Sequence, residues 1–99
     1  MSKANAGVIT KVLKANGYER ALWRKVGVST WTAGFDTEQG WNGVSIQWLT
    51  AGSHRDFTGA ELQAVKTTLT EIADTLSGYG YVALLKGEQY PYLLVNKAD

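Results

Sequence analysis

The sequence contains one histidine and no cysteine, so few kinds of catalytic or metal chemistry are open to it. His54 stands in the tripeptide His54-Arg55-Asp56, which also occurs in kinase catalytic loops, but no glycine-rich loop or lysine strand accompanies it. An acid or base role beside Asp56 or Asp36 would need a pocket, whereas a position just before a helix start is typical of a solvated loop. One histidine without cysteine also cannot build a His/Cys metal site.

The carboxylates, glycines and serines lack the spacings that known sites require. The acidic residues are scattered and form neither a calcium loop nor an H-E-x-x-H zinc helix. The glycines form neither a phosphate-binding loop nor a dinucleotide-binding motif, and no serine stands in G-x-S-x-G. We therefore predict that the protein is not an enzyme and has no catalytic residue, cofactor or metal.

Charge is distributed unevenly, although the formal net charge is only +1. Residues 1–25 hold six Lys and Arg against one Glu, whereas residues 26–99 hold four against eight Asp and Glu. Such asymmetry is typical of a surface for an anionic partner, and equally of a solvated helix face. A low net charge favours a protein partner over a long polyanion such as nucleic acid.

Four tryptophans in 99 residues is a high number. Three of them fall in or beside predicted loops, and only Trp48 falls on the apolar phase of a predicted strand. Tryptophan next to arginine is typical of a protein-binding hot spot, and also of a small core under a loop. Aromatic and basic residues together also occur in single-stranded nucleic-acid binders, but no nucleic-acid-binding motif is present. We predict a partner-binding site made of Arg20, Trp23, Arg24, Lys25, Trp31 and Trp41.

Two amphipathic helices are predicted. One helix is indicated near residues 5–16 by an apolar stripe of Val8, Ile9, Val12 and Leu13, with Asn5 as its N-cap and Gly17 in the left-handed position that ends it. The second helix covers about residues 59–77, where leucine, valine and isoleucine recur every three or four residues and Gly78 provides the stop. The capping box Thr58-x-x-Glu61, with Phe57 and Leu62 as a hydrophobic staple, marks its start.

Two β-hairpins are also predicted, one after each helix. Residues 35–39 and 44–48 alternate between the two faces of a strand and are separated by residues 40–43. Residues 81–86 and 90–96 are two β-prone runs joined by a short loop. The residue types therefore predict one α+β domain, residues 1–99, with the order αββαββ and two helices on one face of a mainly antiparallel four-stranded sheet.

Two further parts of the sequence, Pro91 and residues 22–32, have expected places in this fold. Pro91 has no amide donor, which places it at a sheet edge or at the end of a ladder. Residues 22–32 keep no single period, and they are expected to form an additional edge strand or an ordered loop.

The last two predicted strands are apolar on both faces, so the face away from the helices needs a cover. Three covers are open at this point, namely residues 22–32 folding over it, a second copy in a homodimer, or another macromolecule. No run of the sequence approaches the roughly 20 apolar residues of a membrane span, and the first residues lack the apolar core of a signal peptide. We therefore expect a cytoplasmic protein with no membrane partner.

The run Val12-Leu13-Lys14-Ala15-Asn16-Gly17-Tyr18 is followed by Gly34-Phe35, the strand Val44 to Trp48 and a helix ending in Gly80-Tyr81. This pattern resembles small accessory proteins encoded by actinobacterial phages and related mobile elements. The resemblance implies a non-structural protein of the host cytoplasm and carries over no functional residue. The function we expect is a protein-interaction module that acts on a host or phage protein. The second choice is a nucleic-acid-binding accessory protein that uses the basic N-terminal region and the loop tryptophans.

Overall fold

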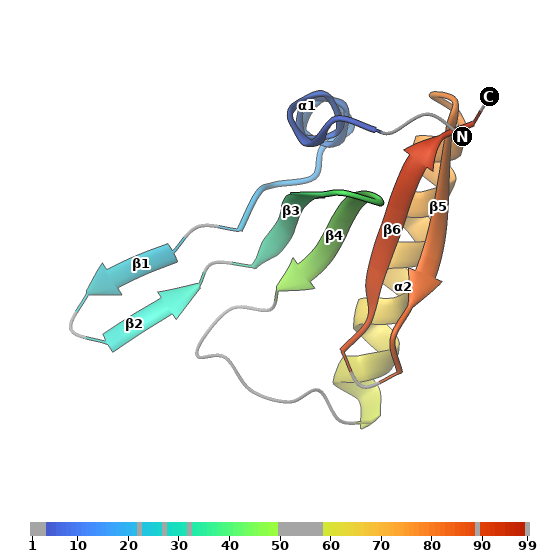
Figure 1. Cartoon of the computed structure of the whole chain (residues 1–99). Helices are drawn as coiled ribbons and strands as arrows, with labels where there is room; N and C mark the ends of the chain where they lie inside the picture. The colour runs from blue at the N-terminus through green and yellow to red at the C-terminus, as the bar shows by residue number, and fades with distance from the viewer. Residues whose placement is uncertain are drawn as a thin grey trace.

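Helices and strands make up most of the computed structural model, which describes residues 4–21, 23–26, 28–31, 33–49, 59–88 and 90–98. Of β1 and β2 only the backbone is described. The elements follow in the order α1 (Ala6–Ala15), β1 (Trp23–Val26), β2 (Val28–Trp31), β3 (Gly34–Gly40), β4 (Gly43–Leu49), α2 (Gly59–Ser77), β5 (Tyr81–Lys86) and β6 (Tyr92–Lys97) (Figure 1). The predicted α+β fold and its αββαββ order are confirmed, with β1 and β2 as an additional hairpin after α1.

The main sheet has four antiparallel strands in the order β3-β4-β6-β5. Helix α2 carries the chain from β4 to the far edge, and β6 then returns between β4 and β5. Pro91 lies immediately before β6, so its missing amide donor falls at the end of a ladder, as predicted. β5 forms one edge, whereas β3 on the opposite edge has a further partner described below.

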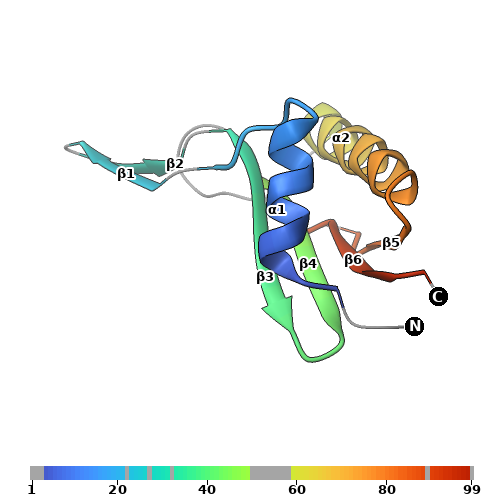
Figure 2. The ribbon, with the colours of Figure 1, turned by 90° about the horizontal axis from the view of Figure 1, so that it is seen from above.

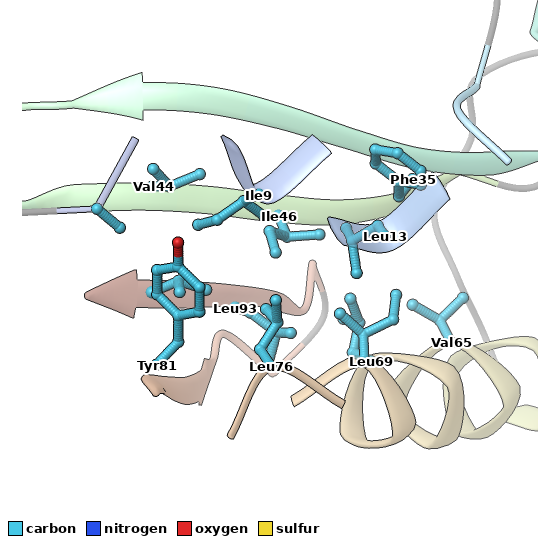
Figure 3. Packing of buried hydrophobic residues seen from close by; sticks show 13 residues of the cluster. Ile9, Leu13, Phe35, Val44, Ile46, Val65, Leu69, Leu76, Tyr81 and Leu93 are labelled. Carbon is cyan, nitrogen blue, oxygen red and sulfur yellow. The ribbon is translucent and has the colours of Figure 1, made fainter. Parts of the chain in front are cut away.

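Both helices pack against one face of this sheet and enclose the core with it (Figures 2 and 3). Ile9 and Leu13 of α1 meet Phe35, Ile46 and other inward-facing side chains of the strands, as the close view shows. From α2 the buried side chains are Val65, Leu69, Ile72 and Leu76 of the predicted stripe, whereas Leu62 at the start of that stripe is only half-buried. Burial of this stripe holds a helix whose exposed threonines lower its intrinsic propensity.

Helix α1 begins and ends where local chemistry predicts. The Asn5 side chain accepts a hydrogen bond from the backbone N–H of Val8 at 3.1 Å, which confirms it as the N-cap. At the other end, Gly17 has φ of 87° and Tyr18 donates its backbone N–H to the Leu13 carbonyl at 3.1 Å. These two features form a Schellman motif, in which a left-handed glycine satisfies carbonyls of the last turn.

Two details of the helix predictions differ in the structure. Val8, expected in the apolar stripe of α1, is 49% exposed because the stripe centres on Ile9 and Leu13, one turn apart on the buried side. Helix α2 ends at Ser77 as expected, but the left-handed glycine is Gly80 and not Gly78. The predicted capping box and staple of α2 include Phe57 and Thr58, which lie outside the described residues.

Residues 22–32 contain a hairpin, which is neither the edge strand nor the loop expected for this segment. β1 and β2 pair with each other in a separate two-stranded sheet, with Trp23 opposite Trp31. Each strand has only four residues, too few to show a period, and their valine, threonine and tryptophan favour extended backbone. In both overall views the hairpin extends away from β5 and β6 (Figures 1 and 2).

The root of this hairpin is held on the edge of β3. Arg20 lies beside Phe35 in a short parallel bridge, where Ala21 donates its N–H to the Phe35 carbonyl at 2.8 Å and Phe35 donates to Glu19 at 3.0 Å. Gly34 permits this approach, because a Cβ there would lie 2.4 Å from the Glu19 carbonyl oxygen. The two ends of the hairpin are therefore closely packed where they join the edge of the main sheet.

Candidate interaction surface

The six residues predicted to bind a partner fall into two separate places. Trp23, Arg24 and Lys25 lie on β1 and Trp31 on β2, with Arg20 exposed at the hairpin root. The sixth residue, Trp41, lies elsewhere: it occupies the turn between β3 and β4, where it is 87% exposed. Since β3 separates this turn from β2, Trp41 lies about 20 Å from the hairpin. The structure groups five residues around the hairpin and leaves Trp41 apart.

The turn that carries Trp41 is held by its neighbours and not by the tryptophan. The Asn96 side-chain amide donates a hydrogen bond to the Asn42 carbonyl at 3.0 Å. Gly43 has φ of 137°, and a Cβ on it would lie 2.7 Å from the Val95 carbonyl oxygen. Trp41 is thus presented on a fixed turn that does not depend on its side chain.

The fourth tryptophan has a structural position. Trp48 lies on the helix-facing side of β4, half-buried, and packs against the core. Its ring meets that of Tyr18 edge to face, with 6.4 Å between the ring centroids. Trp48 is thus on the apolar side of a strand, as predicted, whereas Trp23 and Trp31, expected in or beside loops, lie on β1 and β2.

The sheet face away from the helices, here called the open face, carries a second set of candidate residues. Since side chains alternate along a strand, the neighbours of buried Phe35, Ile46 and Leu93 point to the opposite side. The open face consists of the following side chains: Asp36, Glu38, Ser45, Gln47, Val82, Leu84, Lys86, Tyr92, Leu94 and Asn96.

One row across the open face shows how its character changes from polar to apolar. The register pairs Glu38 with Ser45, Ser45 with Leu94, and Leu94 with Leu84. Leu84 at the end of this row is 47% exposed. Leucine, valine and tyrosine therefore predominate on the β5 and β6 side, with Lys86 and Asn96 at its two ends, whereas two carboxylates lie on β3. No described helix or strand covers this face.

A shallow hollow of 290 Å³ lies on the polar side of the open face. Its lining residues come from the three strands β3, β4 and β6 and the turn after β3: Asp36, Glu38, Asn42, Ser45, Gln47, Tyr92 and Leu94. The small Ser45 side chain between Glu38 and Leu94 leaves this space. The hollow offers two carboxylates, an aromatic ring and a leucine, which suits a cationic group with an apolar stem.

The hollow is not predicted from the sequence, because scattered carboxylates such as Asp36 and Glu38 are usually solvated. The signal was available in the alternation of β3 and β4, which places Asp36, Glu38 and Ser45 on one face. What alternation could not supply was the strand order. Only when β6 lies beside β4 does Leu94 become the neighbour of Ser45.

Every buried side chain among those that the structure describes is apolar or, in the case of Tyr81, aromatic, and none is charged. No three acidic, histidine or cysteine residues in the described ranges lie close enough to hold a metal ion. His54 and Asp56 lie outside the described residues. Neither helix is long and apolar enough to cross a membrane.

Comparison of the chain with protein-family models, with curated proteins and with solved structures finds no match.

Proposed function

We propose that this protein is a non-catalytic protein-interaction module and that the open face is its binding surface. The observation that carries this proposal is the band of apolar side chains on β5 and β6 that no described element covers, with Leu84 47% exposed at its edge. Contiguous apolar surface costs free energy in water, and it is retained where a partner covers it.

The absence of desolvated polar groups among the described residues supports a binding role over a catalytic one. Catalytic acids, bases and nucleophiles are adjusted by burial and by charged neighbours, and no charged side chain in the described part of the chain is buried. The partner we propose is a host or phage protein in the host cytoplasm, a second copy of this chain included, because the sequence pattern resembles small phage accessory proteins.

Site-specific photo-crosslinking tests this function. A photoreactive amino acid at position 84 is expected to capture a protein in host cells, with or without nuclease treatment. The matched control places the same group at Gln63, which is exposed on α2 on the other side of the domain. Equal capture at positions 63 and 84 would argue against the open face as the binding surface.

A second function, nucleic-acid binding, is favoured by one observation. The β1–β2 hairpin extends from the domain as a two-stranded ribbon, and residues 20–35 contain three basic and no acidic side chains. Such a ribbon can enter a nucleic-acid groove. The acidic Asp36 and Glu38 near the hairpin root and the net charge of +1 make this the second choice.

Binding of short DNA and RNA at several salt concentrations tests that alternative. If the three basic residues Arg20, Arg24 and Lys25 neutralise phosphates, log K should fall with log salt with a slope of about −3. A salt-independent or undetectable affinity removes nucleic acid from consideration.

A further inference from the structure

We infer that the partner covering the open face is a second copy of this chain, and that its β1–β2 hairpin is the segment that lies there. This inference rests on the proposed function and names the occupant of the same surface. In the dimer each copy places its hairpin on the sheet of the other, so that the two contacts are related by a two-fold axis.

The hairpin needs a surface to pack against. It consists of two strands of four residues in a sheet of its own, and an isolated two-stranded hairpin is at best marginally stable in water. It also holds two of the four tryptophans, at the directly opposed positions Trp23 and Trp31. Aromatic residues contribute most when they are desolvated against an apolar surface.

The open face has the complementary composition. Leu84, Leu94 and Tyr92 form its apolar side, and these are suitable neighbours for tryptophan rings. Its polar side bears Asp36 and Glu38, which are opposite in charge to Lys25, and position 25 lies on the same side of the hairpin as positions 23 and 31 because successive residues of a strand alternate. A positively charged hairpin on a negatively charged hollow both selects the partner and fixes the orientation.

The geometry of the root explains why the hairpin of a second copy is required. The bridge between Arg20 and Phe35 fixes the hairpin to the edge of β3, whereas Leu84 lies on β5 at the opposite edge. Three strand spacings, about 14 Å, separate those two edges. The hairpin also extends away from β5 and β6 (Figures 1 and 2). In this arrangement the hairpin leaves the apolar side of its own open face uncovered, with Leu84 47% exposed.

Charge reversal on the two surfaces tests this pairing. The face variant carries Asp36→Lys and Glu38→Lys, and the hairpin variant carries Lys25→Glu. Sedimentation velocity at micromolar to high micromolar concentration is expected to show a dimer for the wild type. For each variant alone, the dissociation constant of the dimer should rise by more than about tenfold, because like charges then meet in both contacts.

The equimolar mixture of the two variants provides the decisive measurement. In a heterodimer the unchanged hairpin of the face variant meets the unchanged face of the hairpin variant, and the two reversed surfaces meet each other. We therefore expect the mixture to regain the dimer. This recovery also shows that both variants are folded.

A control variant with Lys11→Glu and Lys14→Glu, both on the exposed side of α1, should dimerise like the wild type. Three results would overturn the inference: a wild type that is monomeric throughout, a mixture that stays monomeric, or a crosslink from position 84 that joins only residues of the same chain. A monomeric wild type whose position 84 captures a different protein would leave the proposed function standing while removing the second copy. Salt-dependent nucleic-acid binding by a monomer, lost in the hairpin variant, would overturn the inference in favour of the nucleic-acid alternative.

Discussion

The two faces of the main sheet are built from the same four strands, yet they differ in what surrounds them. On the inner face Phe35, Ile46 and Leu93 are completely buried under the two helices. The outer face is the open face described above, where Leu84 is 47% exposed and two carboxylates lie on β3. Both faces contain leucine, so side-chain type alone does not distinguish them. The difference is that one face has a cover within the described chain, and this is why stability should depend on the inner face and association on the outer one.

Adjacent residues of β6 provide the strongest test of this difference. Leu93 is buried on the inner face, and Leu94 points to the outer face. Leu93→Ala should lower the free energy of unfolding by about 2–5 kcal/mol because it leaves a cavity, whereas Leu94→Ala should lower it by less than about 1 kcal/mol. Urea denaturation at low protein concentration measures both without a contribution from association. Equal losses would show that the outer face is covered within the monomer.

Substitutions on the open face should not all be harmless to stability, and Gly43→Ala is expected to be a destabilising one. A Cβ at Gly43 would meet the Val95 carbonyl oxygen at 2.7 Å in a backbone with φ of 137°. We expect Gly43→Ala to cost about 2–3 kcal/mol, since it adds a steric clash to the left-handed strain.

Gly17→Ala is the matched control, because Gly17 also has a positive φ but nothing lies within 4 Å of an added Cβ. It should cost only about 1 kcal/mol. Thermal or urea unfolding of both variants tests the ranking, and a cost for Gly17→Ala as large as that for Gly43→Ala would contradict the steric explanation.

The inner face also contains a polar attachment that holds α1. The Gln39 side-chain oxygen accepts the backbone N–H of Ala6 at 2.8 Å, and its amide donates to the Ala4 carbonyl at 3.0 Å. Gln39→Met keeps the size of the side chain but removes both bonds, and it should cost about 1 kcal/mol.

Gln47→Met is its counterpart on the open face, where the side chain is exposed, and this change should stay within about 0.5 kcal/mol. Chemical denaturation of the two variants shows whether the glutamine on the inner face contributes more to the free energy of unfolding than the glutamine on the open face. The attachment of α1 would be unimportant to stability if both glutamine variants unfolded at the wild-type midpoint.

Local chemistry explains why most of the fold was predictable from the sequence. Asn5 and Gly17 mark the two ends of α1 by interactions within one turn, and the leucine stripe of α2 has a clear helical period. The β1–β2 hairpin was missed because four-residue strands show no period. Gln39 was missed because its partners are 33 and 35 residues away. The hollow depends on strand order, which no local pattern contains.

The smallest effect is expected at Trp41, the predicted site residue that the structure separates from the hairpin. Its side chain is 87% exposed, so Trp41→Ala removes almost no buried area and should change the free energy of unfolding by less than about 0.5 kcal/mol. Asn96→Ala is the appropriate comparison, since it removes the hydrogen bond to the Asn42 carbonyl in the same turn and should cost about 1 kcal/mol. Urea unfolding measures both. If Trp41→Ala proved the more costly of the two, the tryptophan would have to be covered by part of its own chain, and the turn would be a packed element of the fold instead of a surface presented to a partner.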